Sequence, residues 1–301
     1  MRKLLILTLV VGLLGQASAE SLPPSVMYST LLNGTTLQED GRLRFSRLTG
    51  YFLPRPATST GSQYLYNPDD GAPLNVLVKK ADGTTVATFG AYAMPHDKVA
   101  WRMDTFRNLA DKSLEYQFTE AGNYVLEFQI NGKTFQKVPF SVKSDGSDDP
   151  YSGLSSVWTL DGDWASYGYI HIPGNSASRT VAFKRWVQGV PERTVLGSAK
   201  ILGPGGKVVG VSPEAQYNLK SRWARTAFNF RKPDGGSSLT GGELTAVPGK
   251  YTVVVVLDGK TFKYPYTVAS GKLLREGRQS FQAPPETRIE GGNDSWWSKS
   301  L

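Results

Sequence analysis

Residues 120–135 read EAGNYVLEFQINGKTF, and residues 247–262 read VPGKYTVVVVLDGKTF. Both stretches place a tyrosine two residues after a glycine, continue through an apolar run, and reach an Asn-Gly or Asp-Gly pair followed by Lys-Thr-Phe. Asn-Gly and Asp-Gly tolerate the positive φ angles of the tight turn that joins two antiparallel strands. The flanking runs are rich in β-branched and aromatic residues, which favour strands. Each stretch therefore predicts a β-hairpin.

The two hairpins belong to a longer internal repeat. Nine of 20 aligned positions are identical, at an offset of 127 residues up to the shared Phe and 126 residues beyond it. A Trp-x4-Phe pair also recurs upstream, beginning at Trp101 and at Trp223. A repeat of this period indicates a duplicated structural unit. We expect one domain at 20–143 and a second at 154–270, joined by a polar linker at 144–153 and followed by a flexible tail at 271–301.

The composition favours strands over long helices. The chain has 32 Gly and 18 Pro, and one of these two residue types recurs every 8–12 residues over most of its length, as in all-β sandwiches. Pro139 and Pro265 fall near the middle of the closing strand of each hairpin. A residue without an N–H is tolerated there only at a sheet edge or a bulge. The predicted fold class is all-β, with two tandem sandwiches that arose by internal duplication.

The corner before each hairpin carries a family resemblance. Glu120-Ala-Gly-Asn-Tyr124, followed by an alternating strand, resembles the tyrosine corner and last two strands of immunoglobulin-like domains, and Val247-Pro-Gly-Lys-Tyr251 is similar without the acidic residue. In that family the tyrosine hydroxyl bonds a backbone group just upstream. With no core cysteines, the chain resembles the disulfide-free bacterial and fibronectin-like branch. The resemblance implies sandwich domains that serve as binding or spacing modules.

The N-terminus predicts export. Arg2 and Lys3 precede an apolar run from Leu4 to Gly15, and Ala17-Ser-Ala19 supplies the small residues that a signal peptidase needs. The run is too short to span a bilayer as a helix, which takes roughly 20 residues. We expect a signal peptide at 1–19, cleaved near Ala19, and a secreted or periplasmic protein. An exported chain with no Cys fits a bacterial envelope better than an animal extracellular space, where small domains rely on disulfides.

Residue counts also restrict the chemistry. Zero Cys excludes disulfides, thiol nucleophiles and Cys-ligated metals, and the two imidazoles are His96 and His171. The sequence contains no GxSxG, HExxH, P-loop or dinucleotide fingerprint. We expect no enzymatic activity and no cofactor. The alternative is a small hydrolase with an unrecognised site near Tyr169 and His171.

Acidic residues in the expected linker raise the question of a metal site. Asp145, Asp148 and Asp149 lie there, and Asp161 and Asp163 flank a glycine further on. Calcium loops space their oxygen ligands more strictly than these residues do. We interpret both groups as turn residues and expect no metal.

Positive charge is concentrated in the second copy. Residues 151–270 carry 14 basic and seven acidic side chains, whereas residues 20–150 carry 13 and 15. Cationic groups beside aromatic rings suit polyanions, because Lys and Arg pair with phosphate or carboxylate while the rings stack. The candidate ligand-binding residues are Lys184, Arg185, Trp186, Lys220, Arg222, Trp223, Arg225, Arg231 and Lys232. The alternative is a solvated strand surface, with Trp223 a core residue like its counterpart Trp101.

These patterns favour a non-catalytic binding or scaffolding protein of the bacterial envelope, whose partner is an envelope protein or a polyanionic polymer. A second interpretation is a two-domain periplasmic chaperone that donates a strand to its client. That function needs an exposed alternating strand late in the first domain. Phe135–Val142 is the candidate strand, although Pro139 interrupts its hydrogen-bond donors.

Overall fold

The computed structural model describes residues 25–26, 28, 31–32, 35–37, 43–45, 49–53, 74–95, 101–108, 115–130, 132–146, 156–279, 283–289 and 294–301. Within these residues the chain is nearly all strand, every strand pair is antiparallel, and the one named α-helix is α2 (Gly241–Thr245). The predicted all-β class is confirmed. In the same part of the chain, no helix is long and apolar enough to cross a membrane. The signal peptide at 1–19 and His96 lie outside the described residues.

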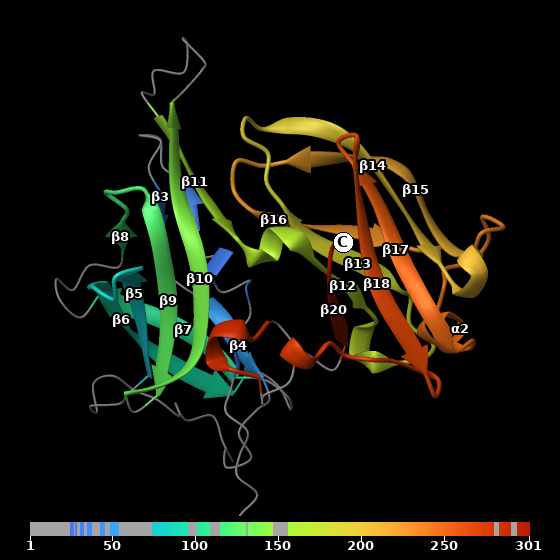
Figure 1. Ribbon diagram of the computed structural model, residues 1–301, viewed down its shortest axis with the longest axis horizontal. Helices are drawn as coiled ribbons and strands as arrows, with labels where there is room; N and C mark the ends of the chain where they lie inside the picture. The colour runs from blue at the N-terminus through green and yellow to red at the C-terminus, as the bar shows by residue number, and fades with distance from the viewer. Residues whose placement is uncertain are drawn as a thin grey trace, which may run out of the picture.

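The first lobe holds strands β1 to β11. Eight of them form one sheet in the order β1-β4-β7-β6-β5-β9-β10-β11, and a small second sheet has the order β2-β3-β8 (Figure 1). The strands are β1 (Ser25–Val26), β2 (Thr35–Leu37), β3 (Leu43–Phe45), β4 (Thr49–Leu53), β5 (Leu74–Lys80), β6 (Thr85–Pro95), β7 (Trp101–Asn108), β8 (Tyr116–Gln117), β9 (Gly122–Ile130), β10 (Lys133–Gly146) and β11 (Ser156–Gly162).

The second lobe holds strands β12 to β20 in two sheets. One has the order β16-β13-β12-β20 and the other β15-β14-β17-β18-β19. The strands are β12 (Tyr167–His171), β13 (Ala182–Val187), β14 (Arg193–Leu202), β15 (Val208–Leu219), β16 (Ala224–Asn229), β17 (Gly249–Leu257), β18 (Lys260–Ala269), β19 (Lys272–Leu273) and β20 (Ser295–Lys299). Short 3-10 turns are η2 (Asp163–Ser166), η3 (Pro173–Asn175), η4 (Pro204–Gly206), η5 (Gly277–Gln279) and η6 (Pro285–Thr287).

The two lobes repeat one strand order. In the second lobe β12-β13-β16 and β15-β14-β17-β18 belong to two antiparallel sheets that pack as a β-sandwich around one apolar cluster. In the first lobe β1-β4-β7 and β6-β5-β9-β10 have the same order, but β7 also bonds β6, so the two parts merge into one sheet. The two lobes therefore differ in whether their two strand groups remain separate sheets.

Both tyrosine corners form as expected. The Tyr124 hydroxyl donates to the Glu120 carbonyl at 2.9 Å, and the Tyr251 hydroxyl donates to the Val247 carbonyl at 2.6 Å. Both rings are 3 % exposed. In the second hairpin Asp258 and Gly259 have φ of 54° and 71°, which matches the predicted turn.

Removing either corner hydroxyl should destabilise the protein. We expect Tyr124→Phe and Tyr251→Phe each to lower the free energy of unfolding by about 1–2 kcal/mol, because a backbone carbonyl loses its donor. Denaturant unfolding of the full chain measures this. Tyr116→Phe is the control, since the Tyr116 hydroxyl makes no hydrogen bond among the described residues. If all three variants are equally stable, the corners contribute nothing.

The prolines lie where the sheets allow them. Pro139 is paired with Val125 on β9, and β11 begins to pair with β10 only at Phe140. Pro265 likewise faces Thr252 on β17, while β19 pairs only with the end of β18. Each proline therefore occupies a stretch of strand with one unpaired edge, as predicted.

The described part of the expected linker, residues 144–146, is strand and not linker. β10 continues through Gly146, and β11 pairs with it from Ser156 back to Gly162. Leu160 is 2 % exposed in the core of the first lobe, so 156–162 extends the first sheet instead of opening a second domain. Residues 147–153 of the expected linker, which include Asp148 and Asp149, lie outside the described residues.

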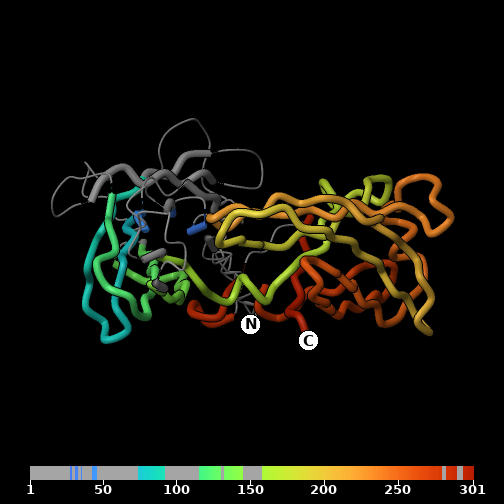
Figure 2. The backbone as a smooth tube through the Cα atoms, turned by 90° about the horizontal axis from the view of Figure 1, so that it is seen from above, coloured from blue at the N-terminus to red at the C-terminus, as the bar shows by residue number. Residues whose placement is uncertain are grey.

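The expected flexible tail is also structured in its described part. β20 pairs with β12 along its whole length, and Trp296 and Trp297 are 6 % and 2 % exposed. The charged residues and prolines of this segment gave no strand pattern in the sequence, because β20 forms only by pairing with the distant strand β12. Figure 2 shows this red C-terminal segment at the junction of the two lobes.

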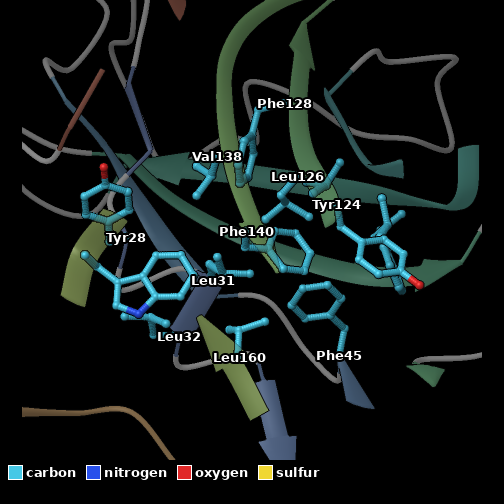
Figure 3. Close-up of a cluster of buried hydrophobic side chains, with 14 of the residues drawn as sticks. Tyr28, Leu31, Leu32, Phe45, Tyr124, Leu126, Phe128, Val138, Phe140 and Leu160 are labelled. Carbon is cyan, nitrogen blue, oxygen red and sulfur yellow. The ribbon is translucent and has the colours of Figure 1, made fainter. Parts of the chain in front are cut away.

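A single apolar cluster crosses the junction. Figure 3 shows Tyr28, Leu31 and Leu32 beside Phe140 and Leu160 in the first lobe. Aromatic side chains from the second lobe join the same cluster, namely Trp164, Tyr167, Tyr169, Trp186 and Trp297. A separate cluster fills the second sandwich, including Phe183, Phe228, Val255 and Tyr264. The lobes therefore share one apolar cluster and do not have fully separate cores.

Candidate functional site

Strand pairing brings three of the nine candidate residues together. β13 lies between β12 and β16, with Lys184 opposite Tyr169 on one side and Trp186 opposite Arg225 on the other. Successive side chains of a strand point to opposite faces. Lys184, Trp186, Arg225 and Tyr169 therefore share one face of the four-stranded sheet, which we call the cationic face.

The aromatic floor of the cationic face is tightly packed. The Tyr169 ring stacks on Trp297 with centroids 4.4 Å apart and planes at 26°. One Arg225 Nη donates to the Tyr169 hydroxyl at 3.1 Å, and the guanidinium lies 6.0 Å from the Trp186 ring centre. These contacts orient an exposed arginine above buried rings. The rings are 2–3 % exposed, so they support the cation and do not form an open stacking platform.

His171 extends the cationic face. It follows Tyr169 at the next position on the same side of β12, and its Nδ1 lies 3.6 Å from an Asp294 carboxylate oxygen. Burial and the charge of Lys184 lower the pKa of His171, although Asp294 opposes this effect. The imidazole is therefore mainly neutral at pH 7 and gains charge only in more acidic solution.

Lys184 on β13 is the lysine of the cationic face. It is half-buried, and no carboxylate among the described residues forms an ion pair with it. Burial lowers the pKa of Lys184, and the positive charge of Arg225 lowers it further, while Asp294 acts in the opposite direction. Cationic groups held close together favour an incoming anion.

Arg185 does not belong to the cationic face. Its side chain points to the other side of β13 and is 5 % exposed, with the guanidinium 3.7 Å above the Phe262 ring. One nitrogen donates to the Ala165 carbonyl at 3.2 Å. Burial lowers the pKa of Arg185. This residue is a core cation of the second sandwich, so its prediction as a surface ligand contact is wrong.

The other predicted cations are dispersed. Lys220 pairs with Glu192 at 3.3 Å, and Lys232 pairs with Glu243 at 2.7 Å. Arg222 precedes β16, and Arg231 forms backbone bridges beyond its end. The structure therefore does not assemble these four residues into one patch with Lys184.

Trp223 joins the lobes. Its indole N–H donates to the Leu160 carbonyl on β11 at 2.5 Å, and its ring meets Trp164 edge-on with centroids 6.0 Å apart. The interpretation of Trp223 as a packing residue fits these contacts. Its hydrogen bond also covers part of the exposed edge of the first sheet.

Ser295 and Asp294 give His171 a partial resemblance to a catalytic triad. The Ser295 hydroxyl, however, donates to Asp294 at 3.1 Å. A triad needs the hydroxyl to bond the imidazole, with the carboxylate on its far side. Among the described residues no hydroxyl is hydrogen-bonded to the His171 imidazole. Among the described residues no three His, Asp or Glu side chains gather as a metal site.

Sequence reasoning missed two members of the site, Asp294 and Trp297, because both lie in the expected tail. Tyr169 and His171 were noted, but their connection to Lys184 needs the β12–β13 register. The alternation of Tyr169 and His171 around Ile170 was the one local signal that they share a face. Comparison of the chain with protein-family models, curated proteins and solved structures finds no match.

Proposed function

We propose that the protein is an exported, non-catalytic binding protein of the cell envelope, and that its cationic face binds an anionic group of a polymer. The observation that carries the proposal is the convergence of Lys184 and Arg225 from two neighbouring strands, with His171 and Asp294 next to them on β12 and before β20. The excess of basic residues in 151–270 adds a long-range field that draws polyanions to this lobe.

The chaperone alternative receives less support. Its candidate strand, 135–142, lies inside β10 between β9 and, from Phe140 on, β11. Around Phe135 and Gln136 the other edge is covered by the segment of η6, where Arg288 donates to the Phe135 carbonyl at 2.6 Å. Strand donation requires free backbone groups, and most of this edge already has partners, at Phe135 and from Phe140 to Val142.

The test uses the mature chain, because β20 completes the second lobe and residues 151–270 lack it. The chain is titrated with duplex DNA and with an acidic polysaccharide at two salt concentrations. We expect binding that weakens steeply with salt, because bound phosphates release counterions. The double variant Lys184→Gln/Arg225→Gln should bind roughly tenfold more weakly and lower the salt slope for DNA by about two.

The control removes the same number of charges elsewhere. Lys200 and Lys263 both flank Val254 on the outer face of the five-stranded sheet, and both are exposed. Lys200→Gln/Lys263→Gln should leave affinity nearly unchanged. Equal losses in both double variants would mean that net charge, not the cationic face, governs binding. No binding by the unaltered chain at low salt would overturn the proposal.

A further inference from the structure

A cavity of about 470 Å³ opens at the end of the second sandwich, on the side of β12 opposite the cationic face. Ile172, Leu273 and Trp296 give it an apolar wall, and Lys272 and Arg275 lie at its margin. Its volume falls in the range of small-molecule sites, which is roughly 300–1,000 Å³. No Asp or Glu is among the described residues that line it.

Small residues keep the cavity open. Gly241 begins α2, and a Cβ at this position would lie 3.0 Å from Ile172 and 3.2 Å from the Ser176 carbonyl. Two bounding turns use left-handed backbone, at Asn175 with φ 50° and Gly271 with φ 71°. A side chain at position 241 would therefore crowd two residues of the lining, Ile172 and Ser176.

The basic residues at the margin of the cavity favour a negatively charged group on a ligand. Arg275 lies 5.3 Å above the Trp296 ring and donates to the Ser295 carbonyl at 2.9 Å, which fixes its orientation. Lys272 forms no ion pair among the described residues and is exposed. Asp294 influences Arg275 electrostatically but does not line the cavity. Two cations beside an apolar wall suit a molecule with an apolar body and an anionic end.

We propose that this cavity binds a medium-chain aliphatic carboxylate. The hydrocarbon chain of the ligand would lie against Ile172, Leu273 and Trp296, and its carboxylate would pair with Lys272 and Arg275. This site is independent of the cationic face, because Trp296 and Ile172 point into the second sandwich while Trp297 and His171 point to the other side. Either proposal can therefore fail without the other.

Calorimetric titration of the full chain with decanoate tests the proposal. We expect saturable one-to-one binding, with decanol roughly tenfold weaker because it lacks the charge, and with acetate inactive because it lacks the chain. Ala177 lines the cavity in an exposed turn, so Ala177→Trp should abolish decanoate binding by filling the space. Lys272→Gln should weaken it about threefold to fivefold, as expected for one exposed ion pair.

Matched controls separate the cavity from the rest of the surface. Ala215→Trp adds the same ring at an exposed position on β15, and Lys250→Gln removes an exposed charge outside the cavity. Both should bind decanoate like the unaltered chain, and Ala177→Trp should still bind polyanion. The proposal is overturned if decanoate does not bind below its micellar concentration, or if Ala177→Trp binds it normally. Loss of binding in Ala215→Trp would likewise contradict it.

Discussion

Replacing Trp297 with alanine is expected to lower the free energy of unfolding by about 3–5 kcal/mol, the range for removing a buried aromatic side chain. The indole is 2 % exposed and stacks on Tyr169. Its other neighbours include Tyr28 from the first lobe, edge-on at 6.0 Å. The Trp297 side chain therefore connects the four-stranded sheet of the second lobe to the core of the first lobe. Its removal would leave a cavity at the junction of the lobes.

Denaturant unfolding of Trp297→Ala measures this effect. Lys299→Ala, an exposed substitution two residues along the same strand, is the control and should change stability by less than about 0.5 kcal/mol. A small change in both variants would show that the C-terminal segment adds little to the fold. It would also contradict the shared core.

Replacing Arg288 with alanine should cost about 2–4 kcal/mol, because a buried charged donor leaves two carbonyls without partners. Arg288 is 8 % exposed and donates to the Ala283 carbonyl at 2.8 Å and to the Phe135 carbonyl at 2.6 Å. The Gln136 amide returns a bond to the Arg288 carbonyl at 3.0 Å. These bonds attach the η6 segment to the free edge of β10.

Hydrogen exchange separates local from global effects of this change. Arg288→Ala should speed exchange along β10 near Gln136 more than in β17 of the second lobe. Arg288→Lys should restore little, since an ammonium group cannot reproduce two separately directed guanidinium bonds. Glu286→Ala, in the same turn but exposed, should leave exchange unchanged. Uniform acceleration in both lobes would argue against a local attachment.

Local chemistry made the hairpins predictable. The Asn-Gly and Asp-Gly turns, the alternating runs and the corner tyrosines each act over a few residues, so their signals survive in sequence alone. Because the same residues recur in the internal repeat, the hairpin and the tyrosine corner predicted for one copy are also predicted for the other. Tyr124 and Tyr251 form the same hydrogen bond because the same backbone corner surrounds both.

Long-range pairing explains the failures. β20 is a five-residue strand whose partner, β12, lies more than 120 positions earlier in the chain, and no local pattern marks such a partnership. β11 was hidden for a related reason, since its polar approach resembles a linker. The shared core could not be foreseen, because Trp164 and Trp297 pack against residues of the other lobe.

The candidate site was predictable only as a composition. Cations beside aromatics pointed to 184–186 and 220–225, but strand phase decides which side chains face outward. Adjacent residues thus separate, with Lys184 on the cationic face and Arg185 in the core. Other predicted cations are neutralised by ion pairs, as Lys220 is by Glu192.

Lysine acetylation read by mass spectrometry locates the bound polyanion most directly. With saturating acidic polysaccharide, Lys184 should be acetylated more slowly than in the free chain, while Lys200 and Lys263 keep their free rates. Protection of Lys200 and Lys263 with no change at Lys184 would place the ligand on the opposite sheet, and the cationic face would lose its assigned role.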